Sequence, residues 1–195
     1  MIHLYAATGN PGKLREFRLA AETRPDIQID LLPGFSEIPP CVETGLTFEE
    51  NAVLKARYYA RYASGLLFAD DSGLEVDALG GAPGVYSARF AGLGATDAAN
   101  NRVLLQTMNG IQPRSARFEC VIALVDNDEV RGIFRGSVAG ELTGEPRGSA
   151  GFGYDPLFYY PPFGCTFGEA TAEQKLSVSH RGQALRALLE FLPQP

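Results

Sequence analysis

Apolar positions in the first third of the chain change period at a glycine-rich turn. Residues 2–7 form a short apolar run that ends in Thr8-Gly9-Asn10-Pro11-Gly12, and residues 13–23 then carry apolar side chains at helical spacing. This order predicts a strand, a tight loop and a helix. Residues 27–32 alternate apolar and polar positions, so we expect a second strand there. A loop rich in Pro and Glu follows.

The middle of the chain predicts a capped helix, a buried strand and an acidic loop. Thr47 and Glu50 have the spacing of a capping box, which marks a helix start. Residues 66–69 form an apolar run typical of a buried strand, and Asp70-Asp71-Ser72-Gly73-Leu74-Glu75-Val76-Asp77 follows at once. We therefore expect Asp70 and Asp71 at the carboxyl end of a strand, where open α/β sheets bind ligands.

The second half of the chain predicts a helix, a long hairpin and a closing helix. Residues 96–108 form the helix, and residues 116–124 alternate as a strand does. Asp126-Asn127-Asp128 is a turn signal, after which residues 129–139 return as a strand. Residues 179–192 complete the chain as a helix. Strands mixed with helices indicate an α/β protein, in which the hairpin is a candidate second lobe.

Composition and charge limit the classes of partner. The 195 residues fit one domain or two small lobes with a shared core. The net charge of −6 argues against a nucleic-acid binder, which needs a basic face, but not against a small phosphate ligand. Neither a signal peptide nor an apolar run of the ~20 residues that span a bilayer is evident. We expect no membrane partner and a cytoplasmic location. The three scattered cysteines suggest neither a zinc site nor a disulfide framework.

The first chemical signal is Thr8-Gly9-Asn10-Pro11-Gly12-Lys13 between a strand and a helix. Glycines allow close approach of a ligand, and amides at a helix start together with a lysine suit phosphate. The spacing is neither that of a Walker A loop nor GxGxxG. A plain strand-to-helix turn remains an alternative.

The second signal is the acidic segment that begins at Asp70. Four acids fall within eight residues, without a basic residue among them. Clustered carboxylates repel one another unless a cation neutralises them, and magnesium with phosphate oxygens is a common solution. A solvated acidic loop is the alternative.

Two further signals lie near the C-terminus. Gly151-Phe152-Gly153-Tyr154-Asp155-Pro156 combines aromatic rings with an acid, which suits stacking on a base and contact with its edge. Lys175 and Ser179-His180-Arg181 offer donors for a carbonyl oxygen or a phosphate. The alternatives are a turn anchored by core aromatics and ordinary surface or capping positions.

These motifs in this order resemble the inosine triphosphate pyrophosphatase family, which includes the bacterial dITP/XTP pyrophosphatases. The resemblance covers essentially the whole chain, and the joint order is far more specific than any one motif. The matching stretches are Thr8–Lys13, residues 43–52, residues 69–74, residues 79–89, residues 151–156 and residues 179–182.

The resemblance implies a fold and an activity. The fold would be an elongated α/β protein on a long mixed sheet with flanking helices, a single domain of two lobes over residues 1–195 with the active-site cleft between them. The enzyme would cleave deaminated purine nucleoside triphosphates (ITP, dITP and XTP) to the monophosphate and pyrophosphate, which keeps these bases out of DNA and RNA. Mg²⁺ would be the cofactor, and a homodimer is expected.

The resemblance also assigns roles. Asp71 would activate water and bind the metal together with Glu43, while Asp70 would support the site. The substrate would be contacted by Thr8, Gly9, Asn10, Pro11, Gly12, Lys13, Lys55, Ser72, Phe152, Gly153, Tyr154, Asp155, Lys175, His180 and Arg181.

Two other functions stay open at this point. One is a housecleaning pyrophosphatase for other modified or pyrimidine nucleotides. The other is a nucleotide-binding sensor without turnover, against which the dense acidic segment speaks, since binding an anion does not require Asp70 and Asp71.

Overall fold

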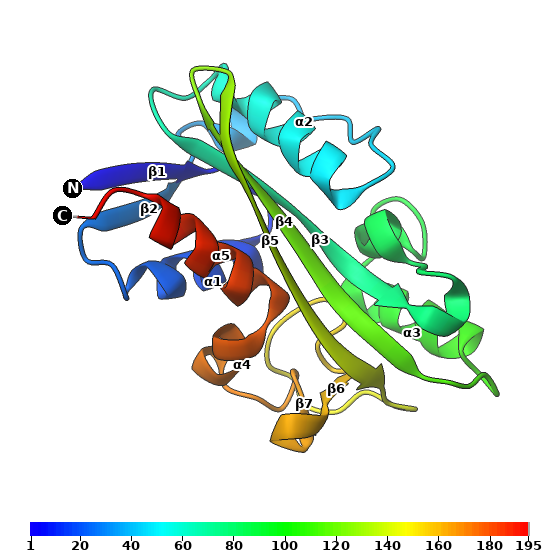
Figure 1. The fold of residues 1–195 in the computed structure, drawn as a ribbon. Helices are drawn as coiled ribbons and strands as arrows, with labels where there is room; N and C mark the ends of the chain where they lie inside the picture. Colours follow the sequence, from blue (N-terminus) through cyan, green and yellow to red (C-terminus); the bar gives the residue numbers. More distant parts are fainter. Residues whose placement is uncertain (195) are drawn as a thin grey trace. The chain divides into compact units, whose positions relative to one another are not determined.

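The computed structural model describes residues 1–194 and contains one seven-stranded sheet in the order β2-β1-β3-β4-β5-β6-β7 (Figure 1). β1 pairs in parallel with β2 and β3, whereas β6 pairs antiparallel with β5 and β7. The strands are β1 (Ile2–Ala6), β2 (Ile27–Leu31), β3 (Leu67–Val76), β4 (Ser115–Asp126), β5 (Glu129–Leu142), β6 (Phe158–Tyr160) and β7 (Cys165–Thr166). The helices are α1 (Pro11–Ala21), α2 (Phe48–Ala60), α3 (Asp97–Thr107), α4 (Ala172–Val178) and α5 (His180–Phe191). The predicted mixed α/β class is confirmed.

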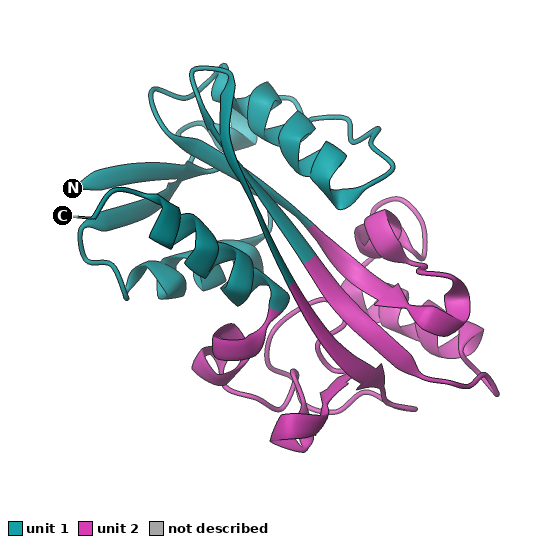
Figure 2. Cartoon of the chain, viewed as in Figure 1, with its two compact units in different colours: residues 1–71, 120–136, 180–195 teal, residues 72–119, 137–179 magenta. Residues whose placement is uncertain are grey.

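The chain divides into two compact units, coloured separately in Figure 2. Unit 1 comprises residues 1–71, 120–136 and 180–195, and unit 2 comprises residues 72–119 and 137–179. Each unit is therefore built from segments distant in sequence, and β3, β4 and β5 each contribute residues to both.

Unit 1 is built around β1, β2 and the first part of β3. Leu4, Phe17 and Phe68 are buried, and the rings of Phe17 and Phe68 meet edge to face at 5.0 Å. Helix α5 lies beside α1 in Figure 1. The apolar face of each helix thus covers the sheet, and this packing fixes the positions of Lys13 on α1 and Arg181 on α5.

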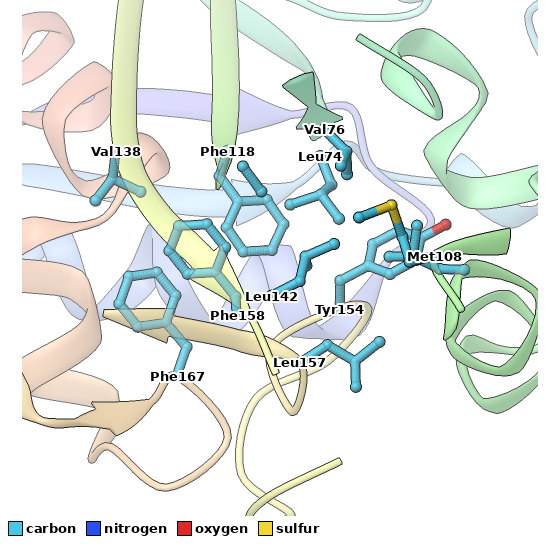
Figure 3. Close-up of a cluster of buried hydrophobic side chains, with 12 residues drawn as sticks. Leu74, Val76, Met108, Phe118, Val138, Leu142, Tyr154, Leu157, Phe158 and Phe167 are labelled. Carbon is cyan, nitrogen blue, oxygen red and sulfur yellow. The ribbon is translucent and has the colours of Figure 1, made fainter. Parts of the chain in front are cut away.

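Unit 2 has its own hydrophobic core, shown in Figure 3. The rings of Phe118, Phe158 and Phe167 pack together, with centroids 4.6 Å apart for the first pair and 5.0 Å for Phe158 and Phe167. Leu74 and Val76 on β3 are fully buried in the same cluster. Burial of this apolar surface stabilises the unit independently of any disulfide, and the three cysteines are free.

Most of the predicted elements are confirmed. Helix α2 begins after Thr47, whose capping box with Glu50 forms as expected. Helix α1 begins two residues earlier than expected, because Pro11 fits the first helical position and Asn10 caps the helix. The hairpin of β4 and β5 turns at Asn127 and Asp128, which have φ values of 48° and 73°. Helix α4 was not expected, although it too begins with a capping box.

The prediction that Asp70 and Asp71 begin a loop is wrong. Both lie within β3, which continues to Val76. The strand outlasts β1 because β4 is its neighbour on the other side. Leu74 and Val76 are buried on the continuation, and their alternation with polar residues is a strand signal that the acidic composition obscured.

Candidate active site

Asn10 organises the loop between β1 and α1. Its side-chain oxygen accepts hydrogen bonds from the amides of Gly12 (2.8 Å) and Lys13 (3.1 Å), and its own amide donates to Thr8 Oγ1 at 3.1 Å. The side chain thereby caps α1, whose N-terminus carries a partial positive charge. The loop is fixed in a conformation that suits an anionic ligand.

Sheet register brings this loop to the acidic part of β3. Ala6 is the partner of Phe68, and the Ala7 amide donates to the Phe68 carbonyl at 2.9 Å. The strands run in parallel, so the chain that leaves β1 at Thr8 passes beside Asp70. Pairing of β1 with β3 therefore places the loop Thr8–Lys13 beside the carboxylates of Asp70 and Asp71.

Asp70 is the centre of a buried charge cluster. Lys13 Nζ lies 2.8 Å from Asp70 Oδ2, and Arg181 Nε lies 3.5 Å from the same oxygen. Arg181 Nη1 also donates to Glu16 Oε2 at 2.6 Å, and Cys120 Sγ is 4.0 Å from Asp70. Burial alone would raise the pKa of Asp70, but the nearby Lys13, Arg181 and Lys55 outweigh it and hold this pKa well below its ordinary value. Asp70 is thus an anion that ties α1 and α5 to the sheet.

Asp71 binds a different set of residues, all from the second helix and the loop before it. Lys55 Nζ lies 3.0 Å from Asp71 Oδ1 and 3.2 Å from Glu43 Oε1. Asn51 Nδ2 donates to Asp71 Oδ2 at 3.2 Å. Asn51 and Lys55 are four residues apart and share one face of α2, so the helix presents an amide and an ammonium to one carboxylate.

The environment of Asp71 favours a proton acceptor. Burial raises its pKa, and Glu43 adds to this effect, while Lys55 and Lys13 oppose it. A carboxylate with a raised pKa is a stronger base near neutral pH than an ordinary aspartate. Burial lowers the pKa of Lys55, but Asp71, Asp70 and Glu43 more than compensate and raise it overall, so Lys55 stays protonated.

The residues around Lys55 fit a divalent cation. Glu43 and Asp71 converge on one ammonium group, which shows that the two carboxylates can share a single positive charge. Within residues 1–194 no group of three or more His, Cys, Asp and Glu side chains is arranged to hold a metal. The pair of carboxylates, Glu43 and Asp71, suits Mg²⁺, which takes one or two carboxylates and completes its coordination shell with water and substrate phosphates.

Unit 2 brings together Phe152, Asp155 and Lys175, three of the residues predicted for the base, whereas His180 and Arg181 belong to unit 1. Asp155 Oδ2 accepts from the Phe152 amide at 2.8 Å and from Lys175 Nζ at 2.5 Å. Lys175 Nζ lies 4.6 Å from the centre of the Phe152 ring. Asp155 and Lys175 are both buried. An acid, a cation and an aromatic ring therefore form one fixed group, although Asp155 and Lys175 are 20 residues apart.

Three of the predicted substrate residues have other structural contacts. The ring of Tyr154 is part of the core of unit 2, and its hydroxyl donates to the Ser87 carbonyl at 2.8 Å, so the side chain packs the protein. Arg181 binds Glu16 and Asp70, and the adjacent His180 is buried at the start of α5. Contact of Tyr154, His180 or Arg181 with a base stays a prediction, as does contact of the partly buried Ser72 with substrate.

Sequence reasoning missed two residues of this site, Glu16 and Asn51. Both carried a detectable signal. Glu16 is three residues after Lys13 and Asn51 four before Lys55, so each shares a helix face with a predicted lysine. A polar residue at such spacing on an otherwise apolar helix face points to the same site.

None of the helices in residues 1–194 is long and apolar enough to cross a membrane.

The model of the Ham1 family matches residues 4–191. A protein named dITP/XTP pyrophosphatase from Acidobacterium capsulatum is 48% identical over 199 residues, covering 97% of this chain and 98% of the relative. One with the same name from Photorhabdus laumondii is 48% identical over 191 residues, with 95% of each chain covered.

Solved structures of Ham1 proteins and related enzymes have a fold similar to that of this chain. A HAM1 protein from Coxiella burnetii superimposes with a TM-score of 0.85 at 42% identity, covering 96% of each chain. A nucleoside-triphosphatase (dITP/XTP pyrophosphatase) from Mycobacterium abscessus gives a TM-score of 0.73 at 38% identity, covering 99% of this chain and 100% of the other. Motif order, fold and full-length similarity lead to the same conclusion: this chain belongs to the Ham1 family.

Proposed function

We propose that this protein hydrolyses deaminated purine nucleoside triphosphates, namely ITP, dITP and XTP, to the nucleoside monophosphate and pyrophosphate. The observation that carries the proposal is the arrangement on β3. Lys13 at the start of a capped helix binds Asp70 at 2.8 Å, while Lys55 joins Asp71 to Glu43. Unit 1 thus holds two lysines beside three carboxylates, which supports a proposed site for a polyphosphate and a metal. The relatives named dITP/XTP pyrophosphatase support the choice of substrate.

The loop Thr8–Lys13 is proposed to bind the phosphates. The N-terminus of α1 offers a partial positive charge, and Lys13 adds a full one. Lys13 is held by Asp70, so its ammonium is positioned before the substrate arrives. Lys55 would contribute a second cation to the phosphates. Charge neutralisation and positioning of this kind supply most of the catalysis in phosphoryl transfer.

Asp71 is proposed to accept the proton of the attacking water. It would also bind Mg²⁺ with Glu43, and the metal would supply polarisation of the phosphate oxygens and a lower pKa for bound water. Asn51 and Lys55 hold one Asp71 oxygen each, which fixes the direction of the carboxylate. The pKa of Asp71, raised by burial, favours proton acceptance.

Phe152, Gly153, Asp155 and Lys175 are proposed to bind the base, together with His180, Arg181 and the Tyr154 backbone. The Phe152 ring offers a stacking surface. Donors that face the 6-oxo group of hypoxanthine would be left unpaired by the 6-amino group of adenine, at a cost of roughly 1–3 kcal/mol per buried group. This polarity would reject ATP. We further propose a cytoplasmic homodimer.

One assay tests the function. The protein is incubated with Mg²⁺ and ITP, XTP, dTTP, GTP or ATP, and pyrophosphate is measured, with a chelator as the control for metal dependence. We expect release from ITP and XTP that the chelator abolishes. Preference for dTTP or a modified pyrimidine triphosphate would indicate another housecleaning pyrophosphatase, and binding without release would indicate a sensor.

A further inference from the structure

Helix α3 contacts the proposed base-binding loop through two side chains that have no assigned role. Asp97 Oδ2 accepts a hydrogen bond from the Gly153 amide at 2.6 Å, and Asn101 Nδ2 donates to the Gly153 carbonyl at 3.0 Å. Asp97 and Asn101 are four residues apart and so lie on the same face of α3. Both polar groups of one residue in the loop are therefore held by one helix.

Gly153 is a sensitive point of this loop. It has a φ of +62°, and it lies between Phe152 and Asp155, which are joined by the hydrogen bond from the Phe152 amide to Asp155 Oδ2. Rotation of the peptides at Gly153 would turn the Phe152 ring and shift the Asp155 carboxylate relative to Lys175. The position of the whole group depends on the backbone at this residue.

Side-chain packing does not hold Gly153 against α3 in addition to the two hydrogen bonds. A pocket of about 530 Å³ lies between α3 and the loop, and Asp97, Asn101, Phe152 and Gly153 are among the residues that line it. A Cβ built on Gly153 would meet nothing within 4 Å. Tyr154 packs in the core of unit 2, but Gly153 itself is backed by open space, and its contacts with α3 are the two polar ones.

Burial of the Asn101 side chain lowers the stability of the fold unless its amide group makes a compensating hydrogen bond. The residue is 8% exposed, and its Oδ1 atom has no hydrogen-bond partner among residues 1–194. A buried acceptor without a partner costs roughly the desolvation of that group, which a leucine or alanine at this place would avoid. Its Nδ2 contact with Gly153 is the compensating interaction in the described structure.

We propose that Asp97 and Asn101 are positioning residues that clamp the Gly153 peptides and thereby set the orientation of Phe152 and Asp155 toward the base. This inference rests on the proposed function for its kinetic consequence. Neither side chain touches the base in this scheme. Their effect is on how well the base-binding group is preformed, which appears in substrate affinity rather than in the chemical step.

The chain offers a matched control in Asn100. It is a buried asparagine on the same helix, and its side chain also bonds to a loop backbone, accepting from the Ala91 amide at 2.8 Å and donating to the Ala88 carbonyl at 3.2 Å. Asn100→Ala therefore removes a buried amide side chain from α3 without touching Gly153. A second control is Asp97→Asn, which retains an oxygen acceptor for the Gly153 amide.

The first experiment measures amide hydrogen exchange by NMR in Asp97→Ala, Asn101→Ala, Asn100→Ala and the wild type, without ligand. The Phe152 amide is the informative probe, because its acceptor Asp155 is unchanged in all four proteins. Faster exchange at Phe152 in the first two variants alone is expected for a clamp. Unchanged exchange at Phe152, or equal acceleration in Asn100→Ala, would overturn the proposal whether or not the protein hydrolyses ITP.

The second experiment measures kcat and KM with ITP for the same proteins. We expect KM to rise about tenfold in Asp97→Ala and in Asn101→Ala with kcat unchanged. Asp97→Asn is expected to stay close to the wild type, as is Asn100→Ala. A fall in kcat without a change in KM would contradict the clamp. Absence of ITP hydrolysis by the wild type would instead refute the proposed function and leave the exchange result to decide on the clamp.

Discussion

Asp70 and Asp71 are consecutive on β3, but each binds the ammonium group of a different lysine. Asp70 contacts Lys13 at 2.8 Å, and Asp71 contacts Lys55 at 3.0 Å. Successive side chains of a strand point to opposite faces of the sheet, so one carboxylate meets α1 and α5 while the other meets α2. Adjacent identical residues thereby acquire opposite pKa shifts, lowered for Asp70 and raised for Asp71. We propose that this difference separates a structural anion, Asp70, from a proton acceptor, Asp71.

Asp71→Asn tests the catalytic half of this division. We expect turnover of ITP to fall by at least about 100-fold, because the amide cannot accept the proton of water and is a weaker metal ligand. Stability should change little, since the variant removes a buried charge and Lys55 keeps its ion pair with Glu43 at 3.2 Å. Pyrophosphate release and thermal unfolding are the two measurements. Near-normal turnover would remove Asp71 from the mechanism.

Asp70→Asn tests the structural half. Lys13 and Arg181 would lose a buried counter-charge, so we expect unfolding to become easier by about 3–5 kcal/mol, measured by urea denaturation. The matched control is Asp30→Asn on the surface of β2, where the aspartate is 36% exposed and pairs with His3 and Arg18. That variant should lose less than about 1 kcal/mol. Equal effects of the two substitutions would mean that Asp70 is not an anchor.

Stability should depend on acid pH through Asp70. Its pKa in the folded protein lies below the ordinary value of 3.8, so the unfolded chain binds the proton more readily. The stabilisation is present above pH 3.8 and declines as the pH falls below it. We therefore expect the difference in unfolding free energy between the wild type and Asp70→Asn to shrink from about pH 5 to about pH 3. Asp71 has the opposite sign, but it is present in both proteins. A difference that grows on acidification would contradict the assignment.

How well the sequence predicts each part of the site depends on how far apart the interacting residues are in the sequence. The capping box of Thr47 and Glu50 forms as the spacing predicts, because its contacts are within one helical turn. The acidic segment was misassigned because pairing with β4, which is distant in sequence, keeps it extended. A carboxylate-rich segment has low strand propensity by itself, and tertiary context overrides that preference.

The remaining contacts of the site join segments that are distant in the sequence. The spacing of residues along the chain does not predict such contacts. Contact of Arg181 with the base stays a prediction, and its observed ion pair with Glu16 joins residues 165 positions apart. The residues of the base loop were predicted as a group, but Tyr154 lies in the core of unit 2 and its hydroxyl bonds to Ser87, 67 positions away. Motif order therefore names candidate residues, and the fold shows which partner each one has within its unit.

Gly151→Ala tests whether the shape of the base loop is set by a steric requirement. Gly151 has a φ of +74°, and a Cβ there would lie 2.0 Å from Asp155 Oδ2. The methyl group would displace the carboxylate that holds Phe152 and Lys175, so we expect KM for ITP to rise by about tenfold or more. We also expect a loss of about 1–3 kcal/mol in stability from the strained backbone.

Gly153→Ala is the matched control for this prediction. Its φ of +62° imposes a comparable backbone cost, but a Cβ at Gly153 would meet nothing within 4 Å. The comparison therefore separates displacement of Asp155 from the cost of a positive φ. Unfolding should be affected to a similar degree in both variants, and KM for ITP should rise more in Gly151→Ala. Equal KM values would show that contact with the Asp155 carboxylate does not explain the glycine at 151.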